Sequence, residues 1–172
     1  MKHKVNLPSS GTMKRCALSL LLACLGLTAL LLAVGCIDTS RDPMRNTNSL
    51  TGVIEAEIQS DHFYYEFGEP VRLRVTLKNV SRESQTVGDG AGPVVDIRLE
   101  TSGMGREWAQ EHPNDVKRQV VLKPGESYIV EWIVTPTGRA YYVATAWWTD
   151  SKGDRTDMGI PVDYGTSLPG QP

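Results

Sequence analysis

Cysteine is missing from the part of this sequence that can fold into a domain. All three cysteines of the 172-residue chain, Cys16, Cys24 and Cys36, lie within or at the end of one apolar segment near the N-terminus. A domain formed after Cys36 therefore has no disulfide to stabilise it. The roughly 115 residues from 50 to 164 are enough for a single hydrophobic core without one.

Acidic residues are missing from the first 35 positions, which hold four of the 18 Lys and Arg. The rest of the chain carries the other 14 basic side chains against 20 acidic ones, a net charge of about −6. Arg72, Arg74 and Lys78 are spaced like the solvent face of a strand and make no basic patch. Because nucleic-acid binding needs such a patch to neutralise phosphates, we expect no nucleic-acid partner.

Motifs of the common catalytic centres are missing too: the sequence has no GxSxG, HExxH, P-loop or GxGxxG. After the N-terminal segment only His62 and His112 remain as histidines. The acidic stretch 150–157 offers carboxylates to a cation, but its spacing is not that of an EF-hand and it contains Lys152 and Arg155. We therefore predict no catalytic residue, no cofactor and no metal, and hence no enzyme.

The N-terminus does contain the pattern of a secretory signal. Basic residues up to Arg15 precede an apolar run over residues 17–34, and small residues lead directly to Cys36. This arrangement resembles a bacterial lipoprotein signal. The resemblance implies that residues 1–35 are a signal peptide, that Cys36 carries the lipid and that residues 36–50 form a polar linker.

An uncleaved membrane anchor is the alternative, because 18 apolar residues just span the roughly 30 Å of a hydrocarbon core. In both cases the positive charges flank only the N-terminal side of the apolar run, which places the following domain outside the cytoplasm. We therefore expect a protein that is attached to the cell membrane, with the lipid bilayer as one partner and its domain on the extracytoplasmic side.

Alternation of apolar and polar residues dominates the rest of the chain. It is strict over residues 71–78, and it recurs at 95–100, 128–134 and 142–148, with weaker candidates at 53–58, 118–122 and 156–162. Turns rich in Gly and Pro separate these runs; Pro124 and Gly125 suit a type II turn, and Gly153 suits a hairpin. The pattern predicts an all-β, immunoglobulin-like antiparallel β-sandwich of about seven to eight strands over residues 51–164, with a signal or anchor helix before it and a disordered tail at 165–172.

Several segments together resemble the BsuPI family of proteinase-inhibitor domains. They are GEPVRLRVTLKNVS at residues 68–81, Asp96, Gly105, Trp108, Gln110, LKPGES at 122–127, Trp132, and Tyr142 to Ala144. Their order and spacing match over roughly residues 67–147. The resemblance implies an all-β domain whose founding members inhibit an intracellular serine proteinase. A domain outside the membrane cannot meet a cytoplasmic proteinase. The resemblance therefore supports the fold of this chain more than the inhibitory activity.

Two residues are candidates for partner binding. Trp147 and Trp148 are adjacent, so on a strand they point to opposite faces, and Trp147 shares the more mixed face with Tyr141 and Val143. Arg139, in the loop 136–140, would suit a trypsin-like specificity pocket, although an ordinary solvated turn residue is the alternative. A second loop, at residues 89–93, is rich in glycine, and we expect it to be too flexible to act as the inhibitory loop.

Two functions follow from these patterns. The first is a membrane-tethered extracytoplasmic binding module without catalytic activity, which acts through protein–protein interaction. The second is an extracytoplasmic proteinase inhibitor of the BsuPI type that acts through an exposed loop.

Overall fold

The structure is a computed structural model that describes residues 42–48 and 52–166. The predicted signal segment, Cys36 and all but the first two residues of the predicted tail lie outside these ranges. Within the described ranges, no helix has the length and apolar character needed to cross a membrane. The lipid anchor and the extracytoplasmic location therefore stay predictions.

Residues 42–48 and 52–166 form eleven strands and one short helix. The strands are β1 (Arg45–Asn48), β2 (Ile54–Ser60), β3 (Tyr64–Tyr65), β4 (Val71–Asn79), β5 (Gln85–Val87), β6 (Val95–Thr101), β7 (Met104–Glu107), β8 (Val120–Leu122), β9 (Ser127–Val134), β10 (Ala140–Thr149) and β11 (Arg155–Tyr164), and the helix is α2 (Trp108–Glu111).

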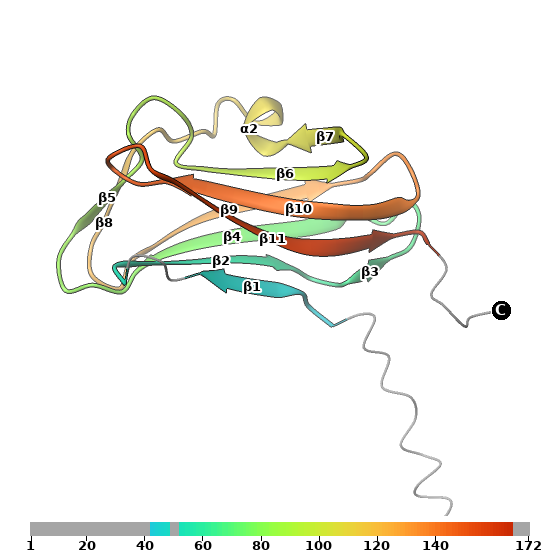
Figure 1. Cartoon of the computed structure of the whole chain (residues 1–172), viewed down its shortest axis with the longest axis horizontal. Coiled ribbons are helices and arrows are strands. Elements are labelled where there is room, and N and C mark those ends of the chain that lie inside the picture. Colours follow the sequence, from blue (N-terminus) through green and yellow to red (C-terminus); the bar gives the residue numbers. More distant parts are fainter. Residues whose placement is uncertain (1–41, 49–51, 167–172) are drawn as a thin grey trace, which may run out of the picture. The chain divides into compact units, whose positions relative to one another are not determined.

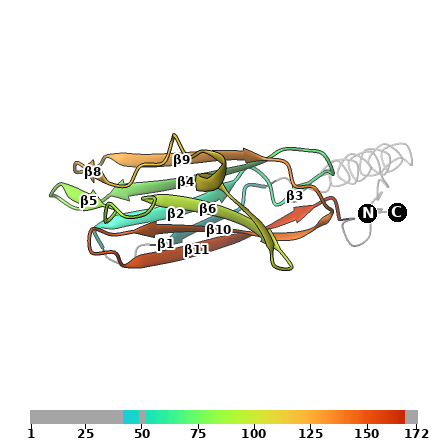
Figure 2. The same cartoon turned by 90° about the horizontal axis from the view of Figure 1, so that it is seen from above.

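Two sheets face each other, with a small two-stranded extension (Figures 1 and 2). One sheet has the strand order β1-β2-β4-β9, the other has β3-β11-β10-β6-β7, and β5 pairs with β8. The pairs are antiparallel except the short β3–β11 pair. The predicted all-β sandwich is confirmed. Strands outnumber the expected seven to eight because β1, β3, β5 and β7, of two to four residues, are too short to show alternation.

The alternating apolar residues fill the space between the sheets, as the sequence predicts. In β4, Val71, Leu73, Val75 and Leu77 are at most 1% exposed, while the charged residues between them lie outside. Trp132 and Trp148 join the same core from the facing strands β9 and β10. Burying one such side chain contributes roughly 1.5–3 kcal/mol, so the core is the main source of stability.

The first strand lies inside the segment predicted as a polar linker. β1 has the sequence RNTN and pairs with β2, and the Asn46 side-chain Nδ2 donates to the Gly159 carbonyl of β11 at 2.9 Å. At the other terminus, Gly165, the first residue of the predicted tail, donates its N–H to Tyr65 O at 2.8 Å. Neither β1 nor Gly165 belongs to an apolar alternation, so these hydrogen bonds, which depend on partners distant in the chain, were not predicted.

Helix α2 links the two sheets through Glu111. One carboxylate oxygen of Glu111 accepts a hydrogen bond from Trp132 Nε1 at 3.2 Å, and the other from Arg106 Nε at 2.6 Å. Arg106 also donates to the Thr135 carbonyl at 3.1 Å. The only polar atom of the buried Trp132 is thereby satisfied, and α2 is joined to β9 of one sheet and β7 of the other.

Strand directions divide the loops between two ends of the sandwich. β2 ends beside the start of β4, since Ser60 pairs with Leu73. In the other sheet, β11 ends beside the start of β10, since Tyr164 pairs with Ala140. The described chain enters at this end, because Arg45 at the start of β1 pairs with Gln59 near the end of β2. We call it the entry end, formed by residues 42–44, 61–70, 102–104 and 135–141. The opposite end holds the loops after β4, β5 and β10.

Candidate functional site

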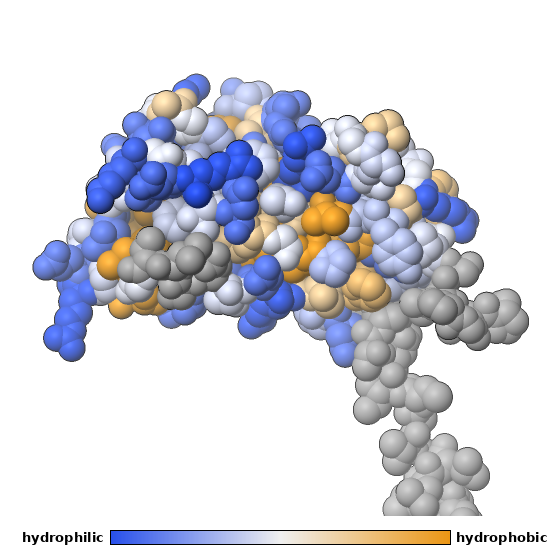
Figure 3. All heavy atoms as spheres, in the orientation of Figure 1, coloured by the Kyte–Doolittle hydropathy of each residue, from blue (hydrophilic) through white to orange (hydrophobic). Residues whose placement is uncertain are grey.

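Three segments meet at the end opposite to the entry end. They are residues 88–94 after β5, residues 117–119 before β8, and residues 150–154 between β10 and β11, and we call them the loop cluster. Their side chains are mainly charged and polar, and Figure 3 shows hydrophilic side chains concentrated at the left end of the view, where these loops lie in Figure 1. The loop cluster is our candidate binding site.

Main-chain hydrogen bonds join the first two segments of the loop cluster. The Val94 N–H donates to Lys117 O at 2.7 Å, and the Gly90 N–H donates to Arg118 O at 3.2 Å. In return, the Arg118 guanidinium donates to Ala91 O. Residues far apart in sequence therefore hold each other in one arrangement, which the sequence could not reveal.

Asp89 stabilises the glycine-rich loop 88–94 through hydrogen bonds within the loop. Its Oδ1 accepts the N–H groups of Ala91 at 2.8 Å and Gly92 at 3.4 Å, an Asx-type turn. These donors lower the pKa of the Asp89 carboxyl, because they stabilise its charged form. The sequence argument that this loop is too rich in glycine to be rigid overlooked Asp89 as a local acceptor, and the Asp89-Gly90 pair was the available signal.

The third segment is built in the same way. Asp150 Oδ1 accepts the N–H groups of Lys152 at 2.7 Å and Asp154 at 2.9 Å. Gly153 has a φ of +89°, so the predicted role of this glycine in the hairpin is confirmed. One oxygen of Asp150, a carboxylate among those that could have served a cation, thus accepts from the backbone. In residues 42–48 and 52–166, no group of three or more His, Cys, Asp or Glu side chains is arranged to hold a metal ion.

The hairpin 150–154 is also tied to the first loop and borders a cleft. Gly88 N–H donates to Thr149 O at 2.8 Å, and Thr149 N–H donates to Val94 O at 3.2 Å. Beside them lies a cleft of about 260 Å³ whose lining includes Gln85, Trp148 and Lys152. Lys152 and Gln85 can both donate hydrogen bonds, so the cleft offers polar contacts next to the loop cluster.

The two predicted partner-binding residues lie apart from each other, and neither belongs to the loop cluster. Trp147 points to the outer face of β10 and is half-buried, with the Arg155 guanidinium 4.3 Å from its ring centroid, whereas Trp148 is 2% exposed. The predicted orientation of this pair is confirmed. Arg139 lies at the entry end, so about eight residues, or roughly 26 Å of extended strand, separate it from Trp147.

Arg139 is exposed but engaged with its own chain. Its Nη1 donates to the Gly165 carbonyl at 3.1 Å, and its guanidinium lies 4.9 Å from the ring centroid of Phe67. An arginine that enters a proteinase pocket must extend away from its loop. Arg139 would have to leave both contacts to do so, which favours the alternative of a surface turn residue.

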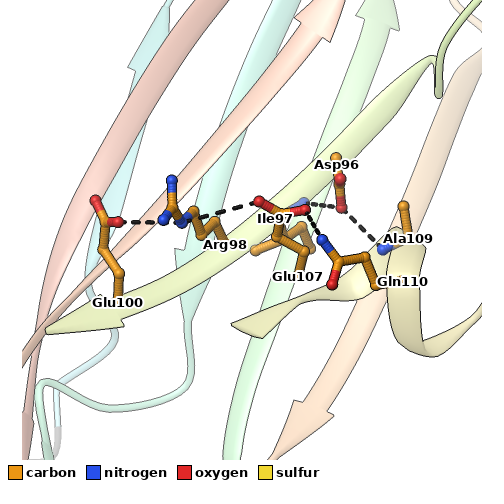
Figure 4. A network of polar contacts seen from close by, with 7 residues as sticks. All are labelled: Asp96, Ile97, Arg98, Glu100, Glu107, Ala109 and Gln110. Atoms are coloured by element: carbon orange, nitrogen blue, oxygen red, sulfur yellow. Dashed lines mark hydrogen bonds and ion pairs between the residues drawn. The ribbon is translucent and has the colours of Figure 1, made fainter. Parts of the chain in front are cut away.

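The buried carboxylate of Asp96 holds α2 against β6, the strand that follows residues 88–94. Asp96 of β6 is 3% exposed, and its Oδ1 accepts the N–H groups of Ile97 at 2.8 Å and Ala109 at 2.9 Å (Figure 4). Burial raises the pKa of Asp96, because the loss of hydration outweighs the two donors. Since residues 112–119 follow α2, this contact helps to position the second segment of the loop cluster.

An ion-pair chain lies beside this contact on the outside of β6 and β7. Arg98 Nε is 3.1 Å from a carboxylate oxygen of Glu100 and 3.9 Å from one of Glu107, and Glu107 also accepts from Gln110 of α2 (Figure 4). These side chains are partly exposed, so each pair contributes little to stability. Asp96 is the member of this network with the largest expected effect.

We expect Asp96→Asn to change how stability depends on pH. A carboxyl whose pKa is raised by folding favours the folded state when protonated, and this contribution is lost as pH rises through the unfolded and then the folded pKa. The asparagine variant does not undergo this loss. Its free energy of unfolding, relative to that of the wild type, should therefore increase between about pH 3 and pH 7 in urea titrations. A difference in free energy of unfolding between variant and wild type that stays constant over this pH range would contradict the prediction.

No protein-family model matches the chain, and no curated protein matches it. Similar solved structures include the sporulation control protein Spo0M from Bacillus subtilis, with 12% identity and a TM-score of 0.44 over 67% of this chain and 51% of that one. This chain thus spans about half the length of Spo0M. The CARDB domain of the PF1109 protein from Pyrococcus furiosus shows 15% identity and a TM-score of 0.39 over 71% and 88% of the two chains. At these identities neither protein assigns a role to a residue of this chain.

Proposed function

We propose that this chain is a membrane-tethered, non-catalytic binding module that recognises a protein or another component of the cell envelope through its loop cluster. The observation that carries this proposal is the set of main-chain hydrogen bonds that join residues 88–94 to residues 117–119 and to Thr149, which directly precedes residues 150–154. A surface that is already ordered loses little conformational entropy on binding. Loops held by a rigid scaffold are also the usual place for binding residues.

The sequence pattern around Cys36 supports the tether. A lipid at this residue would hold the domain at a membrane surface, where a high local concentration makes a modest affinity sufficient. Intact mass of the protein expressed in a bacterial host, beside a Cys36→Ala variant, tests this part. We expect a diacylglycerol-sized increment starting at Cys36 in the wild type alone. An intact N-terminus without lipid would indicate the uncleaved anchor instead.

Site-directed photo-crosslinking of the full chain in its host tests the binding surface. A photoreactive residue at Ala91 or Lys152 places the probe in the loop cluster. One at Thr76, on the outer face of β4, is the matched control. We expect an adduct of the same mass from both loop positions and none from Thr76. Adducts of equal yield at all three positions would contradict recognition through the loop cluster.

A BsuPI-type proteinase inhibitor is the second candidate function, supported by the sequence resemblance over residues 67–147. Because Arg139 is held by Gly165 and Phe67, an inhibitor built on this sandwich would present residues 88–94 rather than Arg139. Titration against secreted serine proteinases separates the two functions. Stoichiometric inhibition that survives Arg139→Ala would support the inhibitor, whereas cleavage of the domain would oppose it.

A further inference from the structure

Large apolar side chains are exposed at the entry end of the sandwich. Phe67 in the β3–β4 connection is 53% exposed, Met104 at the β6–β7 hairpin is 74% exposed, and Tyr141 at the start of β10 is 58% exposed. An isolated exposed apolar residue is common in soluble proteins. Three on separate segments of one end form a surface feature, and we call them the tip residues.

Neighbouring groups contact two of the tip residues, Phe67 and Met104. The Phe67 ring lies edge-on to buried Tyr164, at 5.9 Å between centroids, and the Arg139 guanidinium lies over the Phe67 ring, 4.9 Å from its centroid. Met104 borders an apolar cleft of about 120 Å³ that is also lined by Leu99, Pro136 and Tyr142. Folding therefore leaves these side chains facing outward instead of collapsing them into the core.

The chain enters the described domain at this same end. Met44 contacts the core, and its carbonyl accepts the N–H of Ser60 at the end of β2 at 2.9 Å. Met44 is the eighth residue after Cys36, and a fully extended chain over this separation reaches at most about 28 Å. A lipid on Cys36 would therefore keep the entry end within reach of the bilayer, but it would not by itself fix which face of the domain meets the lipid.

We propose that the entry end docks onto the lipid surface itself, with Phe67, Met104 and Tyr141 inserted at the level of the headgroups. The inference rests on the lipid anchor of the proposed function. Aromatic and apolar side chains partition into this interfacial layer. Docking in this orientation directs the loop cluster away from the bilayer, toward a partner.

Apolar insertion rather than headgroup charge is the expected attraction. Near the tip residues, Arg72 and Arg139 are accompanied by the acidic Asp42, Asp61, Glu66 and Glu69, so this end has an excess of negative charge. A site that recognised anionic lipid would need clustered cations. Docking is therefore expected to be no stronger on vesicles that contain phosphatidylglycerol than on phosphatidylcholine vesicles.

Fluorescence quenching on the reconstituted lipoprotein tests the proposal. The full chain is expressed, its lipid is confirmed by intact mass, and the protein is placed in vesicles whose headgroups carry a nitroxide quencher. A dye is attached through Thr137→Cys at the entry end, Lys152→Cys in the loop cluster, or Thr145→Cys on the outer face of β10. We expect strong quenching at residue 137 and little at residues 145 and 152.

Substitution of the tip residues supplies the second comparison. Removing one large apolar side chain from an interface lowers a partition constant on the order of tenfold. The triple variant Phe67→Ser, Met104→Ser and Tyr141→Ser should therefore bring quenching at residue 137 down to the level at residue 152. The control Val80→Ser with Val121→Ser, at the opposite end, should leave it unchanged.

The outcomes separate docking from anchoring. Equal quenching at residues 137 and 152, stronger quenching at residue 145, or no effect of the triple variant would overturn docking while the lipid mass leaves the anchor intact. Stronger docking on vesicles that contain phosphatidylglycerol would overturn the apolar mechanism. A product without lipid would overturn the proposed anchor, and with it the docking.

Discussion

Replacing Asn79 with alanine is expected to destabilise the domain by about 3 kcal/mol. Asn79 ends β4, is fully buried, and uses all of its amide. Its Nδ2 donates to Leu122 O at 2.8 Å and Glu83 O at 2.7 Å, and its Oδ1 accepts from Ser81 N and Oγ at 2.9 and 2.8 Å. The alanine variant leaves these groups unpaired, at about 1–3 kcal/mol for each buried one. Urea titration measures the loss.

Two related variants identify the cause. Asn79→Asp keeps the shape but replaces both donors with acceptors that face the carbonyls of Leu122 and Glu83. Burial and the two facing carbonyl oxygens should raise the pKa of the new carboxyl, so its destabilisation should be largest at neutral pH and partly reversed by acid. Ser81→Ala removes one partner at a partly exposed position and should cost about 1 kcal/mol. A loss for Asn79→Ala no larger than that for Ser81→Ala would contradict the argument.

Gly88→Ala is expected to have an effect of similar size, about 3–4 kcal/mol. Gly88 has a φ of +89°, and a Cβ at this position would overlap the Arg118 carbonyl oxygen and lie 2.7 Å from Val94 Cγ2. The backbone conformation costs an alanine about 1–2 kcal/mol, and the clash adds about 1–3 kcal/mol because a backbone carbonyl cannot simply turn aside. Thermal unfolding should show a lower Tm, and ligand binding should weaken because the clash separates two segments of the loop cluster.

The same loop contains matched controls for Gly88. Gly90 also has a positive φ, of +83°, but nothing lies within 4 Å of an added Cβ, so Gly90→Ala should show only the backbone cost of about 1 kcal/mol. Gly92 has open space and no positive φ, so Gly92→Ala should leave stability nearly unchanged or slightly raise it. Equal losses at Gly88 and Gly90 would show that the close approach to Arg118 is unimportant.

The long strands could be predicted because each carries its own evidence. Alternation, strict in β4 and looser in β9 and β10, marks the buried face, and the observed burial alternates along all three strands. The turn at Pro124 and Gly125 was predictable for the same reason, since the positive φ of Gly125 and the Glu126 N–H to Lys123 O hydrogen bond depend on local residues. Short strands such as β1 and β7 depend on partners and were missed.

The candidate site was predicted less well than the fold. Arg139 and Trp147 were chosen by residue type, and the structure places them near opposite ends of β10. The loop cluster was missed as a unit because its three segments are spread over residues 88–154 and meet mainly through main-chain hydrogen bonds, such as Gly88 N–H to Thr149 O. Main-chain groups are the same in every residue, so no side-chain pattern announces such a contact.

The sequence alone determined the all-β class, the inward-facing residues and the location of the hairpins, because alternation and turn chemistry act between near neighbours. It also contains the signal pattern that ends at Cys36. Tertiary structure alone decided which loops meet, that Asn79 is buried with a fully used amide, and that Phe67, Met104 and Tyr141 share the end at which the chain enters. These features depend on how strands pair across long separations, and pairing is set by the packing of the whole core rather than by any one segment.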